Sequence, residues 1–562
     1  MKDDLDAVQQ SLKEYWGLDF KRVCSVVQTL ADAAFSSHGE LVTLTALSHR
    51  SIDQIIEALA PFLEREDEGI RLATNVRQQA QVLFAASPPM VDPWGDMARQ
   101  HPALPALTQD LSQRPQPDRH LDHVAATPIT ALKRALFLQH HYDLESATIL
   151  LLGDHDMTAI ALAHVQPDLK LAVADIDERL LAFIDDISQR RNYAIGTYFS
   201  DLRVDLPPSL HGQCDLVFTD PPYTATGIKL FLQRGISALK DRDFTRLVLS
   251  YGYGEQQTAL GYKVQAVLHE LRLVQEAILP HFNQYDNAPA LGDCSDLYIL
   301  RPTRRSLPAA QRIDRQVQIY TQGRLSEESQ HSEIPLPLLK RITTFASERR
   351  DSRPLLVGEP LPKEQVPSSA RMELGPYLQG LREGEKKTQQ RRAIIANLYP
   401  HYTAYILRIC LSSRADELLI CAGARALSDL FAHPSVLRSL VESRYELVER
   451  IQEGNAAITL LKRSSLSSGD DATRVLSRIA ERPQARLANA WREALINWAL
   501  IKGIKLSKNE ARTIIQTRPL GRAHGQSYLG EIPLYALGQL NEEIAATIAA
   551  IDITTERNEQ DG

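Results

Sequence analysis

The stretch ATILLLGDHDMTAIALAHV, residues 147–165, decides the fold. Four consecutive apolar residues lead to Gly153, three polar residues follow, and apolar residues at helical spacing begin at Met157. This pattern predicts a buried strand over Thr148–Leu152, then a tight turn, then a helix.

The alternation of strand and helix continues downstream. We expect a strand ending at Asp175 before a helix in LKLAVADIDERLLAFIDDISQRR (169–191), a short strand in GTYFSDLR (196–203), and a strand with a Pro-rich turn in CDLVFTDPPY (214–223). Alternating strands and helices predict a parallel, doubly wound, Rossmann-like sheet, whose ligands bind beyond the carboxyl ends of its strands. The residues expected at those ends are Gly153, Asp154, His155, Asp156, Asp175, Asp177, Asp201 and Asp220.

The first turn indicates which kind of ligand the sheet takes. It holds a single glycine, Gly153, whereas a dinucleotide site needs several for close approach of the pyrophosphate. Asp175 lies 22 residues further on, where a carboxylate accepts hydrogen bonds from ribose hydroxyls, and Asp201 is placed to accept from an adenine amino group. A nucleoside without phosphates, such as S-adenosylmethionine or its decarboxylated form, fits better than NAD or FAD. The alternative is that these carboxylates only cap helices.

Asp220-Pro221-Pro222-Tyr223 matches the [D/N/S]-P-P-[Y/F/W] motif of amino-group methyltransferases. In that motif the carboxylate and a backbone carbonyl hold an amine, and the aromatic ring stacks on a flat base. An amine attacks carbon only when it is unprotonated, so carboxylates that orient it and remove its proton are needed. The alternative is an ordinary turn with two prolines and no catalytic role.

Residues 128–302 resemble the branched-chain polyamine synthases, the N(4)-bis(aminopropyl)spermidine synthase family. The matching stretches are, in chain order, LLLGDHDMTAIALA, VADIDERLLAFI, FSDLR, DLVFTDPPYT, LFLQRGISALK and HFNQY. The resemblance implies an N-terminal winged-helix domain and a Rossmann-like, methyltransferase-type domain. It also implies a transferase that moves aminopropyl groups from decarboxylated S-adenosylmethionine onto an amine of a polyamine such as spermidine, giving a branched polyamine.

The resemblance also assigns roles to individual residues. Asp156 would be the catalytic base and Asp220 would orient the amine, with His155 as a second candidate base. The donor would be bound by Gly153, Asp154, Asp175, Asp177 and Asp201, and the acceptor by Pro221, Pro222, Tyr223, Phe282, Asn283 and Tyr285. Two residues depart from the family, since His155 and Tyr223 stand where acidic residues are usual. The remaining carboxylates still predict an acidic cleft that attracts a polyamine and repels a phosphate backbone.

Residues 1–88 predict a winged-helix-like domain. A short helix over Thr43–Leu47, a helix over Ile52–Leu63 and a β-wing over Glu64–Leu72 follow one another. The functional alternative is a DNA reader. Eight Lys and Arg against thirteen Asp and Glu disfavour contacts with phosphates, so we expect a structural module.

The remaining segments carry weaker signals. Residues 89–127 and 303–370 are rich in Pro and predict linkers. Residues 371–562 have apolar residues at helical spacing and predict an all-α domain of unknown role, where the family resemblance stops.

Composition limits the setting. The five cysteines are scattered without a CxxC pair, which favours reduced thiols in the cytoplasm, and no run of 18 apolar residues predicts a membrane span. No His, Cys and Asp cluster has metal-ligand spacing, so no metal is predicted. The family resemblance leads us to expect a homodimer. Two alternatives stay open: an S-adenosylmethionine-dependent methyltransferase acting on a nucleic-acid base or another amine, and a non-catalytic, nucleoside-sensing regulator.

Overall fold

The computed structural model of the 562-residue chain describes thirteen stretches, namely residues 2–32, 34–66, 69–85, 92–240, 243–254, 257–286, 293–312, 318–321, 333–366, 369–379, 393–431, 436–464 and 470–560. Internal contacts divide the chain into two compact units. The first comprises residues 1–173, 186–195 and 212–327, and the second comprises residues 174–185, 196–211 and 328–562.

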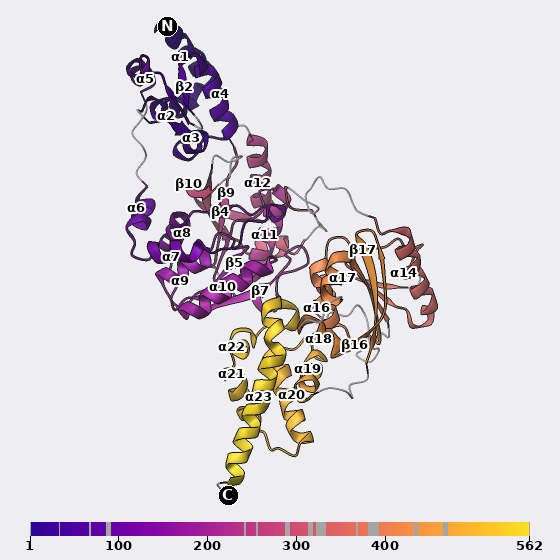
Figure 1. Ribbon diagram of the computed structural model, residues 1–562. Coiled ribbons are helices and arrows are strands. Elements are labelled where there is room, and N and C mark those ends of the chain that lie inside the picture. The colour runs from indigo at the N-terminus through magenta and orange to yellow at the C-terminus, as the bar shows by residue number, and fades with distance from the viewer. Residues whose placement is uncertain are drawn as a thin grey trace. The chain divides into compact units, whose positions relative to one another are not determined.

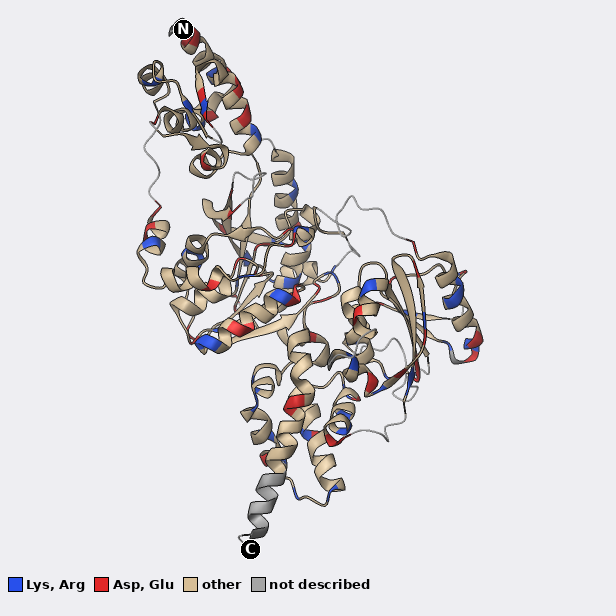
Figure 2. Ribbon diagram, viewed as in Figure 1, with Lys and Arg blue, Asp and Glu red and all other residues tan. Residues whose placement is uncertain are grey.

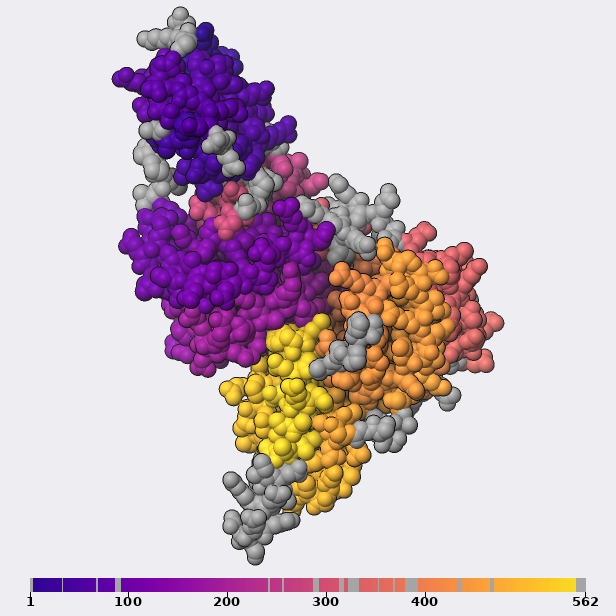
Figure 3. Space-filling model, viewed as in Figure 1, coloured from indigo at the N-terminus to yellow at the C-terminus, as the bar shows by residue number. Residues whose placement is uncertain are grey.

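Five helices and a small sheet form the N-terminal region, which is one compact body in Figure 3. The helices are α1 (Lys2–Trp16), α2 (Phe20–Ala31), α3 (His38–Thr45), α4 (His49–Leu59) and α5 (Arg77–Leu83). The hairpin of β2 (Leu63–Glu66) and β3 (Gly69–Leu72) is joined by β1 (Ser36–Ser37) in the order β1-β3-β2. Helix, turn, helix and hairpin therefore follow in the predicted order. Helix α3 begins earlier than predicted because Ser37 and Glu40 form a capping box.

Helix α4 is the second helix of the predicted helix–turn–helix, the one that would read DNA if the region were a DNA-binding winged helix. It contains Arg50 together with Asp53 and Glu57, and Figure 2 shows no concentration of Lys and Arg along it. A helix with this charge pattern has little attraction for a phosphate backbone.

The segment 89–127 is not the linker that its prolines predicted. Its described part contains α6 (Pro93–Gln100) and α7 (Leu104–Leu111), with a proline at the start of each. Proline in the first turn of a helix is favourable, because the missing N–H has no partner there in any case. Asp110 of α7 is buried and accepts hydrogen bonds from His164 and Arg191, so the segment belongs to the central fold.

The central sheet has eight strands in the order β4-β10-β11-β9-β8-β5-β6-β7. They span Ala125–Ala126 (β4), Thr148–Leu152 (β5), Lys170–Asp175 (β6), Ile195–Phe199 (β7), Leu216–Thr219 (β8), Arg246–Tyr251 (β9), Leu273–Asp286 (β10) and Cys294–Pro302 (β11). Strands β5, β8 and β9 run parallel, and β11 and β10 form an antiparallel hairpin at the end of the row. The sequential order reverses between β5 and β8, and such a switch point is where ligands of doubly wound sheets bind.

Helices cover both faces of this sheet (Figure 1). Helices α8 (Pro128–His141) and α9 (Thr158–Val165) lie on one face, and α11 (Ala225–Ala238) and α12 (Thr258–Glu270) lie on the other; α10 spans Glu178–Arg191. Strand β5 is buried on both sides from Ile149 onward, as its continuous apolar run predicted. The Rossmann-like prediction for the central region is therefore confirmed, but the sheet is mixed and not all-parallel as predicted, because β11 runs antiparallel to β9 and β10.

A second sheet lies where the sequence predicted a Pro-rich linker and an all-α domain. Its order is β13-β12-β14-β15-β17-β16, and its strands span Leu355–Gly358 (β12), Ala370–Met372 (β13), Ala393–Asn397 (β14), Glu417–Gly423 (β15), Tyr445–Glu453 (β16) and Ala456–Arg463 (β17). Its helices are α14 (Leu336–Glu348), α15 (Leu374–Leu378), α16 (Ile406–Ser412), α17 (Ala424–Phe431) and α18 (Val436–Glu442). The helical prediction for this region was wrong, because a strand buried on both faces lacks the two-residue alternation that distinguishes it from a buried helix.

Only the last part of the chain is all-helical. It consists of α19 (Asp471–Ala480), α20 (Leu487–Ile501), α21 (Lys508–Thr517), α22 (Pro519–His524) and α23 (Leu534–Gln560). Trp491, Leu495 and Leu537 are among its buried residues. Among the helices of the described stretches, none combines the length and the apolarity that crossing a membrane requires.

Candidate active site

The turn after β5 buries the carboxylate of Asp154. Gly153 has a φ of +68°, a conformation that glycine adopts without strain. This turn directs Asp154 onto the start of α9, where its oxygens accept hydrogen bonds from the backbone N–H of Thr158 and Ala159. Burial, with the nearby charge of Asp156 adding to it, raises the pKa of Asp154 to about 8, although these hydrogen bonds oppose the shift. Asp154 therefore caps a helix, as the alternative interpretation allowed.

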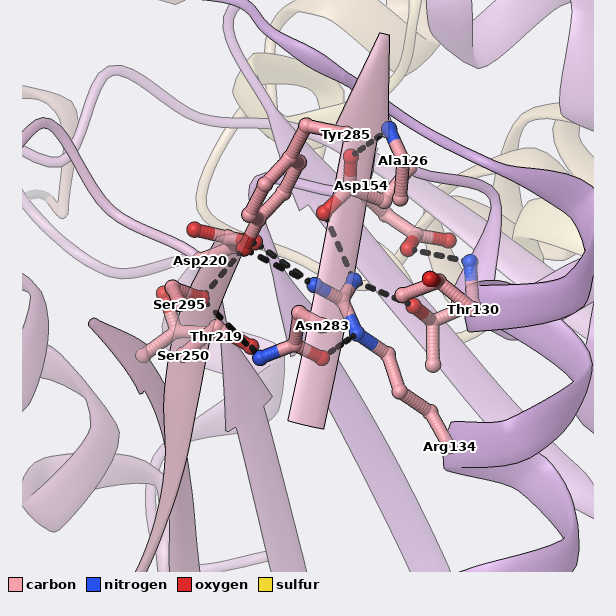
Figure 4. A network of polar contacts seen from close by, with 12 residues as sticks. Ala126, Thr130, Arg134, Asp154, Thr219, Asp220, Ser250, Asn283, Tyr285 and Ser295 are labelled. Carbon is pink, nitrogen blue, oxygen red and sulfur yellow. Dashed lines mark hydrogen bonds and ion pairs between the residues drawn. The ribbon is translucent and has the colours of Figure 1, made fainter. Parts of the chain in front are cut away.

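A buried arginine that the sequence analysis did not single out lies at the centre of the site. Arg134 of α8 is fully buried, and Figure 4 shows its guanidinium group in a network of polar contacts. It donates to Asp156 Oδ2 at 2.6 Å and to Asp220 Oδ2 at 2.8 Å. Further contacts go to Asn283 Oδ1 at 2.8 Å, Thr158 Oγ1 at 3.2 Å and the Tyr285 hydroxyl at 3.2 Å. One permanent positive charge thus joins the turn after β5 to the turn after β8.

Asp156 and Asp220 form a coupled pair of buried carboxyl groups. Burial raises the pKa of Asp156, but the Arg134 charge and hydrogen bonds outweigh burial and leave it below its ordinary value. Burial and the Asp156 charge raise the pKa of Asp220 to about 8, with Arg134 opposing the shift. Near neutral pH the pair therefore keeps one proton, and Asp220 is the member that holds it.

Tyrosine hydroxyls complete the surroundings of Asp220. Tyr285 donates to Asp220 Oδ2 at 2.6 Å, and Tyr223 donates to Oδ1 at 3.0 Å. Burial and the Asp220 charge raise the pKa of both tyrosines well above the ordinary value, so both remain hydrogen-bond donors. Ser295 of β11 contacts the Tyr285 hydroxyl at 2.8 Å and accepts from Asn283 Nδ2 at 3.0 Å.

Strand β10 separates the predicted acceptor residues onto two faces. Asn283 and Tyr285 point to Arg134, as their hydrogen bonds show. Phe282 instead packs edge-on against Phe137, with the Lys133 ammonium 4.3 Å from its ring centre. Because side chains alternate along a strand, Phe282 cannot share the face of its two neighbours. This packing does not support a contact of Phe282 with the acceptor, and its role as an acceptor-binding residue stays a prediction.

A cluster of tyrosine rings borders the site at the end of β9. The Tyr251 ring lies 5.7 Å from that of Tyr223 and 6.1 Å from those of Tyr253 and Tyr298, measured between ring centres. Tyr251 is 1% exposed, and its hydroxyl has no hydrogen-bond partner among the residues that the structure describes. A buried hydroxyl without a partner is unfavourable, so this one is available to a ligand.

His155 and the two prolines are in the same region. His155 is 6% exposed and stacks on His123, with ring centres 4.5 Å apart. Pro221 and Pro222 are buried in the turn after β8. The role of His155 as a second base stays a prediction.

The carboxylates predicted to hold the donor ribose follow β6. Asp175 is 4% exposed, and its Oδ1 accepts the backbone N–H of Asp177 at 2.7 Å. Asp177 is 7% exposed and forms a two-pronged ion pair with Arg179, whose side chain is about half exposed. This geometry keeps Asp177 oriented at the start of α10.

Asp201, predicted to accept from adenine, follows β7 and is paired with Arg203. Both side chains are 1% exposed, and the guanidinium nitrogens Nε and Nη2 lie 2.8 and 2.5 Å from the two carboxylate oxygens. The backbone N–H of Asp201 donates to the hydroxyl of Tyr405 at 3.3 Å. The sequence analysis missed both partners.

The signals for the missed residues differ. Arg134 interrupts the apolar face of TALKRALFL, and an arginine flanked by buried positions is an indication of a buried ion pair. Ser295 and Arg203 have no such local signal. Across the described stretches, no group of three or more His, Cys, Asp or Glu side chains is placed to hold a metal ion.

Comparison with known proteins agrees with the chemistry of this site. Residues 106–304 match the model of the branched-chain polyamine synthase A C-terminal domain. The N(4)-bis(aminopropyl)spermidine synthase of Methanocaldococcus jannaschii is 34% identical over 188 residues, which are 33% of this chain and 53% of the relative. The enzyme of the same name from Thermococcus kodakarensis is 34% identical over 185 residues, 32% of this chain and 51% of the relative.

These matches cover only part of each protein. The chain spans about half the length of the curated relatives it matches. The solved branched-chain polyamine synthase of Thermus thermophilus, in complex with N4-aminopropylspermidine and 5′-methylthioadenosine, is 24% identical with a TM-score of 0.41, covering 54% of this chain and 94% of that one. The resemblance of the central region to the branched-chain polyamine synthases is confirmed.

Proposed function

We propose that this protein transfers aminopropyl groups from decarboxylated S-adenosylmethionine to an amine of a polyamine such as spermidine. The observation that carries the proposal is the buried Asp156–Asp220 pair, which stands at the ends of two adjacent parallel strands and shares a proton near neutral pH. The identity of the transferred group and of its polyamine acceptor is inferred from the name of the relatives, N(4)-bis(aminopropyl)spermidine synthase.

In the proposed reaction the acceptor nitrogen attacks the carbon next to the donor's sulfonium sulfur. A nitrogen–carbon bond forms, the carbon–sulfur bond breaks, and 5′-methylthioadenosine leaves with the electron pair of that bond. The amine proton passes to the Asp156–Asp220 pair. Within the pair, Asp220 accepts this proton in the chains in which it is deprotonated, and that fraction grows as the pH approaches its pKa of about 8. A general base works best when its pKa is near the working pH.

Arg134 has two roles in this proposal. Its charge keeps Asp156 ionised, and it opposes the protonation of any amine that approaches the pair. A fixed cation beside an amine lowers the pKa of that amine, as in enzymes that activate lysine this way. The bound acceptor thereby keeps the lone pair that it needs for attack.

The donor and acceptor contacts are assigned on the same basis. Asp175 and Asp177 would hold the ribose, and Asp201 the adenine, each directly after a strand of the central sheet. Asn283 and Tyr285 would act through Arg134. The unpartnered hydroxyl of Tyr251 and the ring of Tyr223 would contact the acceptor, since tyrosine faces attract ammonium groups.

One observation favours methyl transfer instead. Tyr223 completes the Asp-Pro-Pro-Tyr motif of amino-group methyltransferases, and its hydroxyl is bonded to Asp220. Transfer of a methyl group from intact S-adenosylmethionine to an amine would use the same carboxylate pair. A non-catalytic, nucleoside-sensing protein would have no need of that pair.

The winged-helix identity of the N-terminal region, its lack of DNA binding and the expected homodimer stay predictions.

The deciding experiment offers the purified protein each donor in turn with spermidine and measures product masses. The proposal expects mass added in aminopropyl units with the decarboxylated donor only. Mass added in methyl units would establish the methyltransferase instead. Asp156→Asn is expected to lose turnover while binding the nucleoside product as the wild type does, and a fully active variant would refute the role of the carboxylate pair.

A further inference from the structure

The central sheet and the second sheet share one register across five strands. In the central sheet the cross-strand row Leu152–Thr219–Leu249–Tyr298–Ile278 runs through β5, β8, β9, β11 and β10. In the second sheet the row Val357–Ala396–Ile420–Thr459–Arg450 runs through β12, β14, β15, β17 and β16. The strand directions match as well, because in each sheet three parallel strands are followed by an antiparallel hairpin.

Two irregular features also coincide. The last strand shifts register between Gln275 and Ala277 in the central sheet, and between Leu447 and Glu449 in the second. When the two rows are superposed these are the same positions. A β-bulge at a matching place is a specific mark of common architecture. Strand β10 has a further register shift between Leu279 and Asn283, which has no counterpart in the β16–β17 pairing.

The helix before the first strand repeats in sequence. Helix α8 contains Leu132-Lys133-Arg134, and α14 contains Leu339-Lys340-Arg341. Each arginine reaches the last strand of its own sheet, since Arg134 contacts Asn283 of β10 and Arg341 contacts Glu449 of β16. The first strands end in LLLGD and LLVGE, with Gly153 and Gly358 both at positive φ. Residues 336–463 thus repeat the central fold.

The second copy lacks the transfer chemistry. Asn397 stands at the register position of Asp220, and an amide accepts no proton at neutral pH. Leu361, the third residue after Gly358, stands where Asp156 follows Gly153, and it is buried in the apolar core. A tight turn at Gly454 closes the hairpin, so the segment that carries Asn283 and Tyr285 in the first copy has no counterpart.

The edge where a ligand would bind in the second copy contacts a loop of the chain instead. This donor-side loop is Ser200–Asp205, directly after β7. Arg203 Nη2 donates to the His401 carbonyl after β14 at 3.2 Å, and Tyr405 accepts from the Asp201 N–H. Gln379 of the segment after β13 donates to Asp205.

The fit of this loop is close on one side and open on the other. A side chain at Gly375 would lie 3.0 Å from the Val204 carbonyl oxygen, so the first turn of α15 approaches the loop backbone directly. Beyond it the loop borders a cavity of about 240 Å³, lined among others by Ser200, Asp205 and Tyr405. With space on that side, the polar contacts of Arg203 and Tyr405 determine where the loop lies.

We propose that residues 336–463 are a degenerate second copy of the central fold whose ligand edge binds the donor-side loop and fixes Asp201 for the donor, instead of binding a substrate of its own. Arg203 and Tyr405 are then positioning residues: Arg203 holds the carboxylate of Asp201, and His401 and Tyr405 hold Arg203 and the loop backbone. The part that concerns the donor rests on the proposed function. The anchoring of the loop does not.

The test measures anchoring and nucleoside affinity separately in the full-length protein. Hydrogen–deuterium exchange of peptides from residues 196–211 is compared between the wild type and Arg203→Met, and 5′-methylthioadenosine binding is followed by calorimetry. The proposal expects at least tenfold faster exchange in the loop, at least tenfold weaker nucleoside binding, and kcat at saturating donor within threefold. Arg203→Lys is expected to restore part of the affinity. Tyr405→Phe is expected to change both readouts in the same direction and by less.

Arg341→Met is the matched control, because it removes an arginine of the second copy that contacts Glu449 and not the loop. It is expected to leave loop exchange and nucleoside affinity unchanged. The wild type is expected to bind one nucleoside per chain.

Three results would overturn the inference: unchanged loop exchange in Arg203→Met, unchanged nucleoside affinity in that variant, or two nucleosides bound per wild-type chain. A wild-type chain that binds no nucleoside would refute the proposed function and the donor part together. Loop exchange would still decide the anchoring.

Discussion

The two α/β regions of this chain have the same strand register and differ in the polar groups at the ends of β8 and β14, the equivalent strands of the two sheets. In the central sheet Asp220 meets Arg134, Tyr223 and Tyr285, so a carboxyl group with a raised pKa is held in a closed network. In the second sheet the buried Asn397 donates only to the Glu359 carbonyl, as far as the described stretches show. The architecture persists in both, because it depends on apolar residues that fill two faces of each strand.

The comparison separates what a fold requires from what a reaction requires. The sheet depends on its buried strands, in which Ile420 and Leu249 occupy the same register position in the two regions. The reaction depends on a few groups whose charge is set by burial and by one another. A copy can therefore lack the catalytic groups and keep the same strand register.

The largest effect is expected when Asp220 of the central sheet is replaced by asparagine, the residue at the equivalent position of the second sheet. Asp220→Asn is expected to lower turnover by a factor of about 10² to 10⁴, the range ascribed to general acid–base catalysis. Product formation measured by mass over hours checks the loss. Far-ultraviolet circular dichroism and thermal unfolding serve as the control that the variant remains folded. A variant within tenfold of the wild type would show that Asp220 takes no proton from the amine.

The two arginines of the repeated Leu-Lys-Arg segment provide a stability test. Arg134 is fully buried and contacts two carboxylates, whereas Arg341 and its partner Glu449 are partly exposed. Arg134→Met is expected to lower the free energy of unfolding by about 3–5 kcal/mol, because it leaves buried carboxylates without a counter-charge. Arg341→Met is expected to change it by about 0–1 kcal/mol.

Urea unfolding of both variants at pH 7 measures this difference. Equal losses would contradict it, since they would mean that burial does not distinguish the two ion pairs. At pH 5 the loss in Arg134→Met is expected to be smaller, because burial raises the pKa of Asp156 once Arg134 no longer opposes it, and the carboxylate then takes up a proton as the pH falls.

The comparison also explains how much the sequence predicted. The central sheet was predictable because polar residues end each strand, as in LLLGDHD and LVFTDPPY, and mark the boundaries between strands and turns. The second sheet was missed because AIIAN and ELLICAG carry no alternation, and short apolar runs fit a buried helix equally well. Its weak copy of the first motif, LLVGE, lies within a Pro-rich stretch that was interpreted as a linker.

Among the site residues, the carboxylates were predictable and their partners were not. Asp156 and Asp220 follow strands, where position along the chain indicates the site. Arg134 comes from a helix that precedes the sheet, and Arg203 pairs with Asp201 through a turn. Which cation meets which carboxylate depends on tertiary packing, and no spacing in the sequence encodes it.

Turnover and stability are expected to change in opposite directions with pH, because both depend on the protonation of Asp220. Asp220 has a pKa of about 8 in the folded protein, above its ordinary value of about 4. Between these values the folded chain holds a proton that the unfolded chain releases, so stability falls as the pH rises. Turnover needs the deprotonated carboxylate and is expected to rise over the same range.

Urea unfolding and kcat/KM measured from pH 5 to pH 9 test this pair of trends. In Asp220→Asn the free energy of unfolding is expected to fall less between pH 5 and pH 9 than it does in the wild type. Asn397→Asp is expected to add a similar fall to the second copy, because it buries a new carboxyl group at the equivalent position. An unchanged pH profile of stability in both variants would show that neither position titrates in this range.

The smallest expected effect concerns the hydroxyl of Tyr251, whose register position holds Ala422 in the second copy. In the described part of the chain this buried hydroxyl has no partner, so Tyr251→Phe removes an unsatisfied group and is expected to change the free energy of unfolding by about 0–1 kcal/mol, toward greater stability. If the acceptor supplies the missing partner, the same change raises KM for the polyamine about three- to tenfold and leaves kcat within twofold, because one neutral hydrogen bond contributes about 0.5–1.5 kcal/mol. Steady-state kinetics with varied polyamine measure this, and Tyr298→Phe, which alters the neighbouring ring cluster without touching that hydroxyl, is the control. An unchanged KM in Tyr251→Phe would place the acceptor elsewhere along the tyrosine rings.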